Sequence, residues 1–185
     1  MKPKPTFRYE NILRAIGQGL EKLNVKSFRL EISDGHYVVS GKCRDGKPKH
    51  ATKSVIKKAF LRLVQTVRWK KAAPEPFQFT GLRFTRRDID LLDRTGKFLR
   101  LNLDRCPPNL HSISHVLRMT GAYLDHADGL LLKLSWRHGI LTLWSINGLG
   151  AHSKEDFTLQ ELYDLWVHQF KKRRLLRILK PTGSD

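Results

Sequence analysis

Hydrophobic and polar positions follow one another in the same order in two separate stretches of the chain. In the first, apolar residues recur every three or four positions from about residue 9 to residue 23, which is the spacing of one helix face. Residues 28–32 then alternate between apolar and polar side chains, as in a half-buried strand. Asp34-Gly35 is typical of a two-residue hairpin turn, and a return strand begins at residue 37. This stretch predicts a helix followed by a hairpin.

A second helix is predicted over residues 50–71, after a loop rich in glycine and lysine from Gly41 to Lys49. Outside its apolar stripe, the surface of this helix is almost purely cationic, and the helix runs into Trp69-Lys70-Lys71. Regularly spaced cations can follow the phosphates of a nucleic acid backbone, whereas the plainer interpretation is a solvated helix face. The apolar stripe of this helix consists of Ala51, Val55, Ile56, Ala59, Phe60, Leu63, Val64 and Val67.

The same order returns 104 positions later without a gap. A helix over 112–126, capped by Ser112 or Ser114, precedes two strands over 130–136 and 140–146. A capping box of the Thr-x-x-Glu type opens a last helix at residue 158, and this helix ends in a basic run. We therefore expect an internal duplication. Its matched pairs include Leu13/Leu117, Gly17/Gly121, Leu30/Leu134, Gly35/Gly139, Arg68/Lys172 and Lys70/Arg174.

The stretch between the two copies has no counterpart in the first. Residues 72–76 form a linker, residues 77–84 an extended segment, and Thr85 to Asp88 cap a short helix that runs through Leu92. Another strand is expected over 98–103. The predicted fold class is α+β, with two tandem αββα (helix–hairpin–helix) units joined by a strand and a short helix. The units divide the chain at 1–73, 74–110 and 111–185.

The net charge of the chain indicates what kind of partner to expect. The chain has 35 Lys and Arg against 17 Asp and Glu, a formal net charge of +18. Residues 1–73 hold 18 of the bases and 5 of the acids, so the first unit is the more positive. Phosphate backbones accept such an excess as their counterions leave. A generally basic surface without a specific acidic partner is the simpler alternative.

Candidate phosphate contacts come from the loop, the basic helix, the connecting segment and the C-terminal helix. Arg68 and Lys70 gain weight because the duplication repeats them. Trp69 is the ring most expected to be exposed; Tyr37 and Trp144 lie on hairpin strands, where rings can stack on bases, although tryptophans more often fill cores. The candidate contacts are Lys42, Arg44, Lys47, Lys49, Lys53, Lys57, Lys58, Arg62, Arg68, Lys70, Lys71, Arg86, Arg87, Lys171, Lys172, Arg173 and Arg174.

Residues suited to catalysis or metal binding do not form a convincing set. His111 and His115 are four positions apart, close to Cys106, but no second pair completes a zinc site, and surface or capping roles are favoured. Asp88 and Asp90 point about 200° apart on a helix and would not share a metal. The Asn-Gly-Leu-Gly segment at 147–150 lacks the further residues of a phosphate loop and is interpreted as a turn. We expect no metal, no cofactor and no enzymatic activity.

Two cysteines are too few for a disulfide scaffold, and neither a leader peptide nor a membrane span is evident, which predicts a cytoplasmic location. The predicted function is a non-enzymatic nucleic-acid-binding protein. Duplex DNA is favoured over RNA, because two similar units suit a repeated backbone. One alternative is a structural or adaptor subunit that binds an acidic protein or an RNA-containing complex. Another is a nuclease or nucleic-acid-processing enzyme with an unrecognised site. The oligomeric state is left open.

Overall fold

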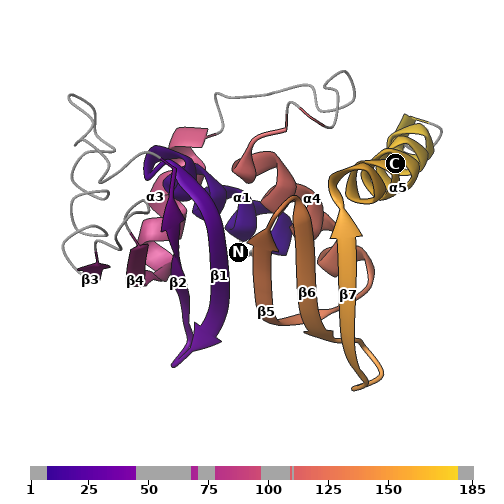
Figure 1. The fold of residues 1–185 in the computed structure, drawn as a ribbon. Helices are drawn as coiled ribbons and strands as arrows, with labels where there is room; N and C mark the ends of the chain where they lie inside the picture. The colour runs from indigo at the N-terminus through magenta and orange to yellow at the C-terminus, as the bar shows by residue number, and fades with distance from the viewer. Residues whose placement is uncertain (1–7, 45–67, 71–77, 97–108, 110, 179–185) are drawn as a thin grey trace, which may run out of the picture.

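Seven strands form one antiparallel sheet in the computed structural model, which describes residues 8–44, 68–70, 78–96, 109 and 111–178 (Figure 1). The protein is therefore α+β. In chain order the elements are α1 (Tyr9–Lys22), β1 (Val25–Ser33), β2 (His36–Cys43), β3 (Arg68–Lys70), β4 (Gln78–Phe84), α3 (Arg86–Gly96), α4 (Ile113–His126), β5 (Leu130–Arg137), β6 (Ile140–Ile146), β7 (His152–Thr158) and α5 (Leu159–Ile178).

The strand order across the sheet is β3-β4-β2-β1-β5-β6-β7. The two predicted hairpins, β1–β2 and β5–β6, meet at the centre, where β1 pairs antiparallel with β5. Leu30 lies opposite Leu134 at this junction, and both side chains are fully buried. The division at 1–73, 74–110 and 111–185 stays a prediction, but the sheet contains strands from all three segments.

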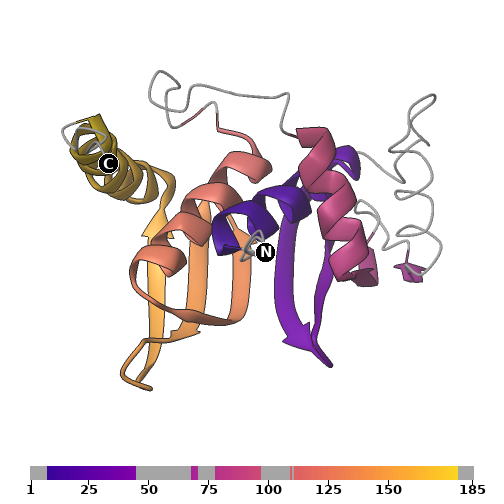
Figure 2. The same ribbon diagram turned by 180° about the vertical axis from the view of Figure 1, so that it is seen from behind.

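Three helices cover one face of the sheet. Figure 2 shows α1 and α4 side by side across the centre, with α3 beside α1. α5 leaves the end of β7 and packs against α4 at the edge of this layer (Figure 1). The opposite face of the sheet carries no helix among the described residues, which is common for antiparallel sheets.

The core lies between the sheet and these helices. On α1 it takes the apolar stripe that the sequence predicts, namely Leu13, Ile16 and Leu20. The two central helices approach closely at glycines. A Cβ on Gly17 would lie 2.5 Å from Ser114 Cα, and a Cβ on Gly121 would lie 2.4 Å from the Tyr9 carbonyl carbon. Only glycine fits at these two positions.

Local signals in the sequence correctly predict several elements. The first helix and hairpin and their later counterparts occur within a few residues of their expected bounds. Both hairpin turns have two residues with positive φ, at Asp34-Gly35 and His138-Gly139, as type I′ turns require. Both capping boxes form: Asp88 accepts hydrogen bonds from the Thr85 amide and hydroxyl, and Glu161 accepts the same pair from Thr158.

Three predictions about the elements are wrong. Arg68–Lys70 is a strand that pairs with β4, not the end of a helix; the rest of the predicted helix over 50–71 lies outside the described residues. Gly41 to Cys43 belongs to β2 rather than to a loop. The second unit contains an additional strand, β7, so its order is αβββα. The strand expected over 98–103 lies outside the described residues.

The 104-residue offset recurs in the geometry of the two halves. Adding 104 to the bounds of α1 gives those of α4, and the positive-φ residue before the first strand of each hairpin is Asn24 or Asp128. The correspondence stops at β3: residues 68–70 are a strand, whereas 172–174 lie in α5.

Reciprocal hydrogen bonds join the two central helices at their ends. Asp125, near the end of α4, accepts hydrogen bonds from the Tyr9 and Glu10 amides at the start of α1, each 3.0 Å long. Glu21, near the end of α1, accepts hydrogen bonds from the Ser114 amide and hydroxyl at the start of α4, each 2.8 Å long. The side chain of each helix's own N-cap residue forms no such bond, so each helix start depends on the opposite helix.

Candidate nucleic-acid interface

The alternation of side chains along each strand separates a buried face from an open face. On β6, Leu141, Leu143 and Ser145 are buried against the helices, while Thr142 and Trp144 point to the other side and are half-buried. Strand registers extend this assignment to the neighbouring strands, because directly paired residues share a face. The open face can therefore be followed residue by residue.

Trp144 stands on the open face between two lysines. Lys133 of β5 and Lys154 of β7 are its direct cross-strand partners. The Lys133 ammonium lies 4.3 Å from the centre of the tryptophan ring, and the Lys154 ammonium lies 5.8 Å from it. Both distances are in the range in which a cation is attracted to the face of an aromatic ring. The result is a ring flanked by positive charge from two strands.

Cations outnumber carboxylates on the described part of the open face. Arg29 is partly neutralised, because its guanidinium pairs with Glu31 on the same strand. Asp156 lies on β7, where it pairs with Thr142 of β6. The six cations that the registers place here are Arg29, Lys42, Arg83, Lys133, Arg137 and Lys154, against the two acids Glu31 and Asp156.

The residues predicted from the sequence do not come together on one described surface. Lys42 lies on the open face, and Arg44 follows β2 in an exposed position. Arg86 and Arg87 are exposed in the first turn of α3, in the helical layer behind the sheet. Arg68 and Lys70 lie on β3, and Lys171, Lys172, Arg173 and Arg174 lie on α5, with only their backbone described. Lys47, Lys49, Lys53, Lys57, Lys58, Arg62 and Lys71 lie outside the described residues.

The sequence-based list of candidate contacts lacks five of the six open-face cations, namely Arg29, Lys133, Arg83, Arg137 and Lys154. The first two alternate with buried residues on strands that were correctly predicted, so the period-two pattern already placed them opposite the core. Arg137 was assigned to the turn, but it ends β5. Lys154 had no such signal, because its strand β7 was not predicted.

The aromatic candidates separate clearly. Tyr37 faces the helical layer and packs against the core; burial, together with the nearby Tyr9, raises its pKa to about 12. Trp166 is buried and Trp136 packs against the core. Trp144 is the one tryptophan whose described side chain lies on the open face; the side chain of Trp69 is outside the described part.

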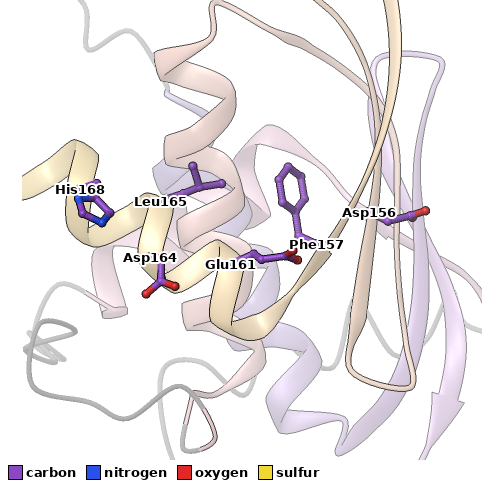
Figure 3. A pocket seen from close by; sticks show the side chains of 6 residues that line it. All are labelled: Asp156, Phe157, Glu161, Asp164, Leu165 and His168. Carbon is purple, nitrogen blue, oxygen red and sulfur yellow. The ribbon is translucent and has the colours of Figure 1, made fainter.

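A second surface feature has the opposite charge. A shallow hollow of about 400 Å³ lies between β7 and α5, lined by Asp156, Phe157, Glu161, Asp164, Leu165 and His168 (Figure 3). Glu161 is engaged in the capping box, and Asp164 accepts a hydrogen bond from Gln160. Figure 3 shows Asp156 pointing away from the helix. The carboxylates of such a hollow disfavour phosphate within the hollow itself.

The histidines considered as zinc ligands pack between helices instead. His115 is buried, which corrects the prediction of a surface or capping role for it. The His111 ring makes edge-to-face contacts with His115 and with Tyr163 of α5. Burial lowers the pKa of His115, and the neighbouring His111 and Arg118 act in the same direction against Glu21. No group of three metal-binding side chains occurs among the described residues.

The carboxylates considered for catalysis have structural surroundings. Asp88 is engaged with Thr85, as capping predicts, and Asp90 is half-buried.

In the part of the chain that the structure describes, no helix is both long and apolar enough to cross a membrane. Comparisons with protein-family models, with curated proteins and with solved structures found no match to this chain.

Proposed function

We propose that this chain is a non-enzymatic nucleic-acid-binding protein that uses the open face of its sheet to hold phosphates. The observation that carries the proposal is the distribution of charge on that face: six cations against two carboxylates, with two of the cations beside Trp144. The net charge of +18 gives the whole molecule a long-range attraction for a polyanion. The carboxylates of the hollow beside α5, among them Asp156 at the edge of this face, oppose phosphate contacts within the hollow.

The spacing of these cations suits a backbone with many phosphates. Arg83 lies on β4 and Lys154 on β7, five strand steps apart. At about 4.8 Å per step, the cations span roughly 24 Å across the sheet. A single bound phosphate would engage one end of this surface only, whereas a nucleic acid chain can engage both ends. Phosphate contacts of this kind hold the ligand without reading its sequence.

We also propose that the two halves of the sheet arose by duplication of a helix–hairpin unit. Support comes from the constant 104-residue offset of α1 and α4, the matched positive-φ positions and the reciprocal helix-end hydrogen bonds. The pairing of β1 with β5 adds to this support, because Leu30 meets its own counterpart, Leu134. The strand at 68–70 limits the duplicated part to the helix and hairpin. The sequence-based preference for duplex DNA stays a prediction.

Salt-dependent binding tests the proposed function. Duplex DNA, single-stranded DNA and duplex RNA are titrated with the full chain at several salt concentrations. Binding that weakens linearly on a log–log plot supports phosphate contacts. A chain that binds none of the three overturns the proposal. An acidic polypeptide that binds as tightly as the nucleic acids overturns it too, in favour of an adaptor for acidic proteins.

A matched pair of variants locates the contacts. Arg83→Ala with Arg137→Ala removes two exposed cations from the open face; Arg86→Ala with Arg87→Ala removes two exposed cations from the helical layer. The open-face variant should lose about 0.9 from the salt slope on B-form DNA for each lost phosphate contact. The control should keep its slope. The reverse result places the interface on α3, as the sequence predicted for Arg86 and Arg87, and removes it from the sheet.

A further inference from the structure

Two kinds of surface meet at Trp144. Lys133 and Lys154 flank the ring with positive charge. Along the same open face, Ile146 pairs with Leu130, which is 53% exposed. The ring therefore continues into an apolar strip that no described element covers. Cations beside exposed apolar surface complement a chain in which phosphates alternate with flat, weakly polar bases.

We infer that Trp144 is a stacking platform for an unpaired base, so that the open face takes single-stranded nucleic acid. This inference rests on the proposed function and names its ligand. In a duplex the faces of the bases are already covered by their neighbours, and proteins meet only base edges and the backbone. A tryptophan ring stacks most readily on an unpaired base, because stacking inside a duplex first requires neighbouring base pairs to be separated. The face of the ring is thus more informative than the cations about the form of the ligand.

The two lysines remain useful once a base arrives. An exposed lysine gains little from its contact with a ring, and a base gains more by stacking on it. When a base takes a place on the ring, the displaced ammonium of Lys133 stays within reach of the backbone phosphate beside that base. Lys154 is exposed on β7, with its ammonium 5.8 Å from the ring centre, and offers a second phosphate contact. Base and phosphates are then held together.

The platform belongs to one half of the molecule only. The position 104 residues before Trp144 is Ser40, on the open face of β2. The position 104 residues before Ile146 is Lys42. The first half therefore presents a cation and a hydroxyl where the second half presents apolar surface. A strand of nucleic acid that crosses the sheet would meet phosphate contacts on β2 and β4 and a base-binding site on β6.

The test compares ligands that differ only in their bases. A labelled oligothymidylate of about 12 nucleotides supplies unpaired bases, an abasic oligonucleotide of equal length supplies the same phosphates, and the duplex with oligodeoxyadenylate hides the bases. Trp144→Ala should weaken binding of oligothymidylate about tenfold, as expected for losing one stacked base. Its binding to the abasic chain and to the duplex should change less than twofold.

Two further variants separate stacking from folding. Trp144→Phe keeps a smaller ring and should recover most of the affinity for oligothymidylate. Ile140→Ala truncates another apolar side chain of the same strand and face, 39% exposed and remote from the lysine pair, and should bind as the parent does. Circular dichroism should show the same fold for all three. Titrating oligothymidylate into the parent should quench tryptophan fluorescence, and this quenching should be lost in Trp144→Phe.

The outcomes distinguish this inference from the proposed function. If the parent binds all three ligands equally and Trp144→Ala changes none of the affinities, the stacking platform is wrong while nucleic-acid binding stands. If Trp144→Ala weakens all three ligands alike, Trp144 acts through phosphate contacts or the fold, and the inference also fails. If the parent binds no ligand, the proposed function fails, and the inference fails with it.

Discussion

The two halves of the sheet have a similar backbone arrangement but different side chains on the open face. In residues 9–43 and 113–146 the helix, the turn and the strands correspond at one constant offset. Buried positions match in character, as Leu13 with Leu117 and Leu30 with Leu134 show. On the open face the match breaks down: a serine corresponds to Trp144. Close packing restricts which side chains fit at the buried positions, whereas the open face is under no such restriction.

The same comparison separates what each half adds. The second half continues into β7 and α5, which line the acidic hollow. On the side of the first half, β2 pairs with β4, and β4 in turn pairs with β3. As a result, carboxylates gather at the β7 end of the sheet. Perturbing equivalent positions in both halves measures how far the equivalence extends.

The largest effect is expected at the glycines between the central helices. Gly17→Ala and Gly121→Ala each place a methyl group against backbone atoms, which cannot turn aside as a side chain can. We expect each to lower the free energy of unfolding by about 3 kcal/mol, although alanine itself favours helix by up to about 1 kcal/mol. Urea unfolding followed by circular dichroism measures the change.

The control for the glycines is Gln18→Ala, next to Gly17 and half-buried on the same helix. It should change stability by about 0.5 kcal/mol or less. A large loss at one glycine with none at the other would break the comparison, because the two helices would then not depend on each other equally.

The carboxylates that hold the helix starts should have a smaller and matched effect. Asp125→Ala frees the Tyr9 and Glu10 amides, and Glu21→Ala frees the Ser114 amide and hydroxyl. Each should cost about 1.5 kcal/mol, in the range of a lost helix cap with a charged acceptor. The amide variants Asp125→Asn and Glu21→Gln keep an acceptor oxygen and should lose less. Thermal unfolding of all four variants checks the order.

Tyr123 tests a link that exists in the second half only. Its hydroxyl donates to both carboxylate oxygens of Glu155 on β7, at 2.8 and 2.9 Å, while the equivalent first-half residue is Gly19. Tyr123→Phe should cost about 1 kcal/mol. A loss too small to detect would show that β7 is held by its strand pairing alone.

The titration of Tyr123 gives the same link a pH dependence. Burial and the bond to Glu155 raise its pKa to about 12, above the value near 10 of an unfolded chain. A raised pKa means that the stabilisation is complete below about pH 10 and is lost as the pH rises towards 12. Tyrosinate absorbance should therefore show late transitions from Tyr37 and Tyr123, and the contribution of Tyr123 should be absent in Tyr123→Phe.

The smallest effect is expected at the capping box of α5. Hydrogen bonds from the Thr158 amide and hydroxyl lower the pKa of Glu161. A lowered pKa gives stability that is present above the unfolded value near 4.3 and is lost as the pH falls through the folded value. In Thr158→Ala, carboxyl titration by NMR should show a higher pKa for Glu161. Thr85→Ala removes the equivalent hydroxyl at α3 and should leave Glu161 unchanged.

Elements with a local signal could be predicted from the sequence, and the others depended on distant pairing. The helix–hairpin segments carry periodic apolar residues and a turn such as Asp34-Gly35, so their order follows from neighbours in the chain. β7 was missed because Phe157 is the one large apolar residue in an otherwise polar strand. β3 was missed because Arg68–Lys70 continues the pattern of a basic helix, and its strand form depends on pairing with β4.

The candidate site was harder to predict than the fold. Lys42, which lies on the open face, was a candidate because it belongs to a cationic run. Lys133 and Lys154 lie 21 residues apart and meet at Trp144 only through two strand registers, which composition does not encode. The junction of β1 with β5, which brings the cations of both halves onto one face, is likewise a contact between distant segments.

The central junction also shapes how the chain must fold. Every residue pair that it contains is about 104 positions apart, so none forms until a long loop has closed. Such non-local pairing makes folding slow compared with the formation of the local hairpins. Until then, β1 and β5 each expose an unpaired edge that fits the other strand from any copy of the chain. Crowded refolding should therefore yield domain-swapped dimers, in which each half completes its sheet with the opposite half of a second molecule.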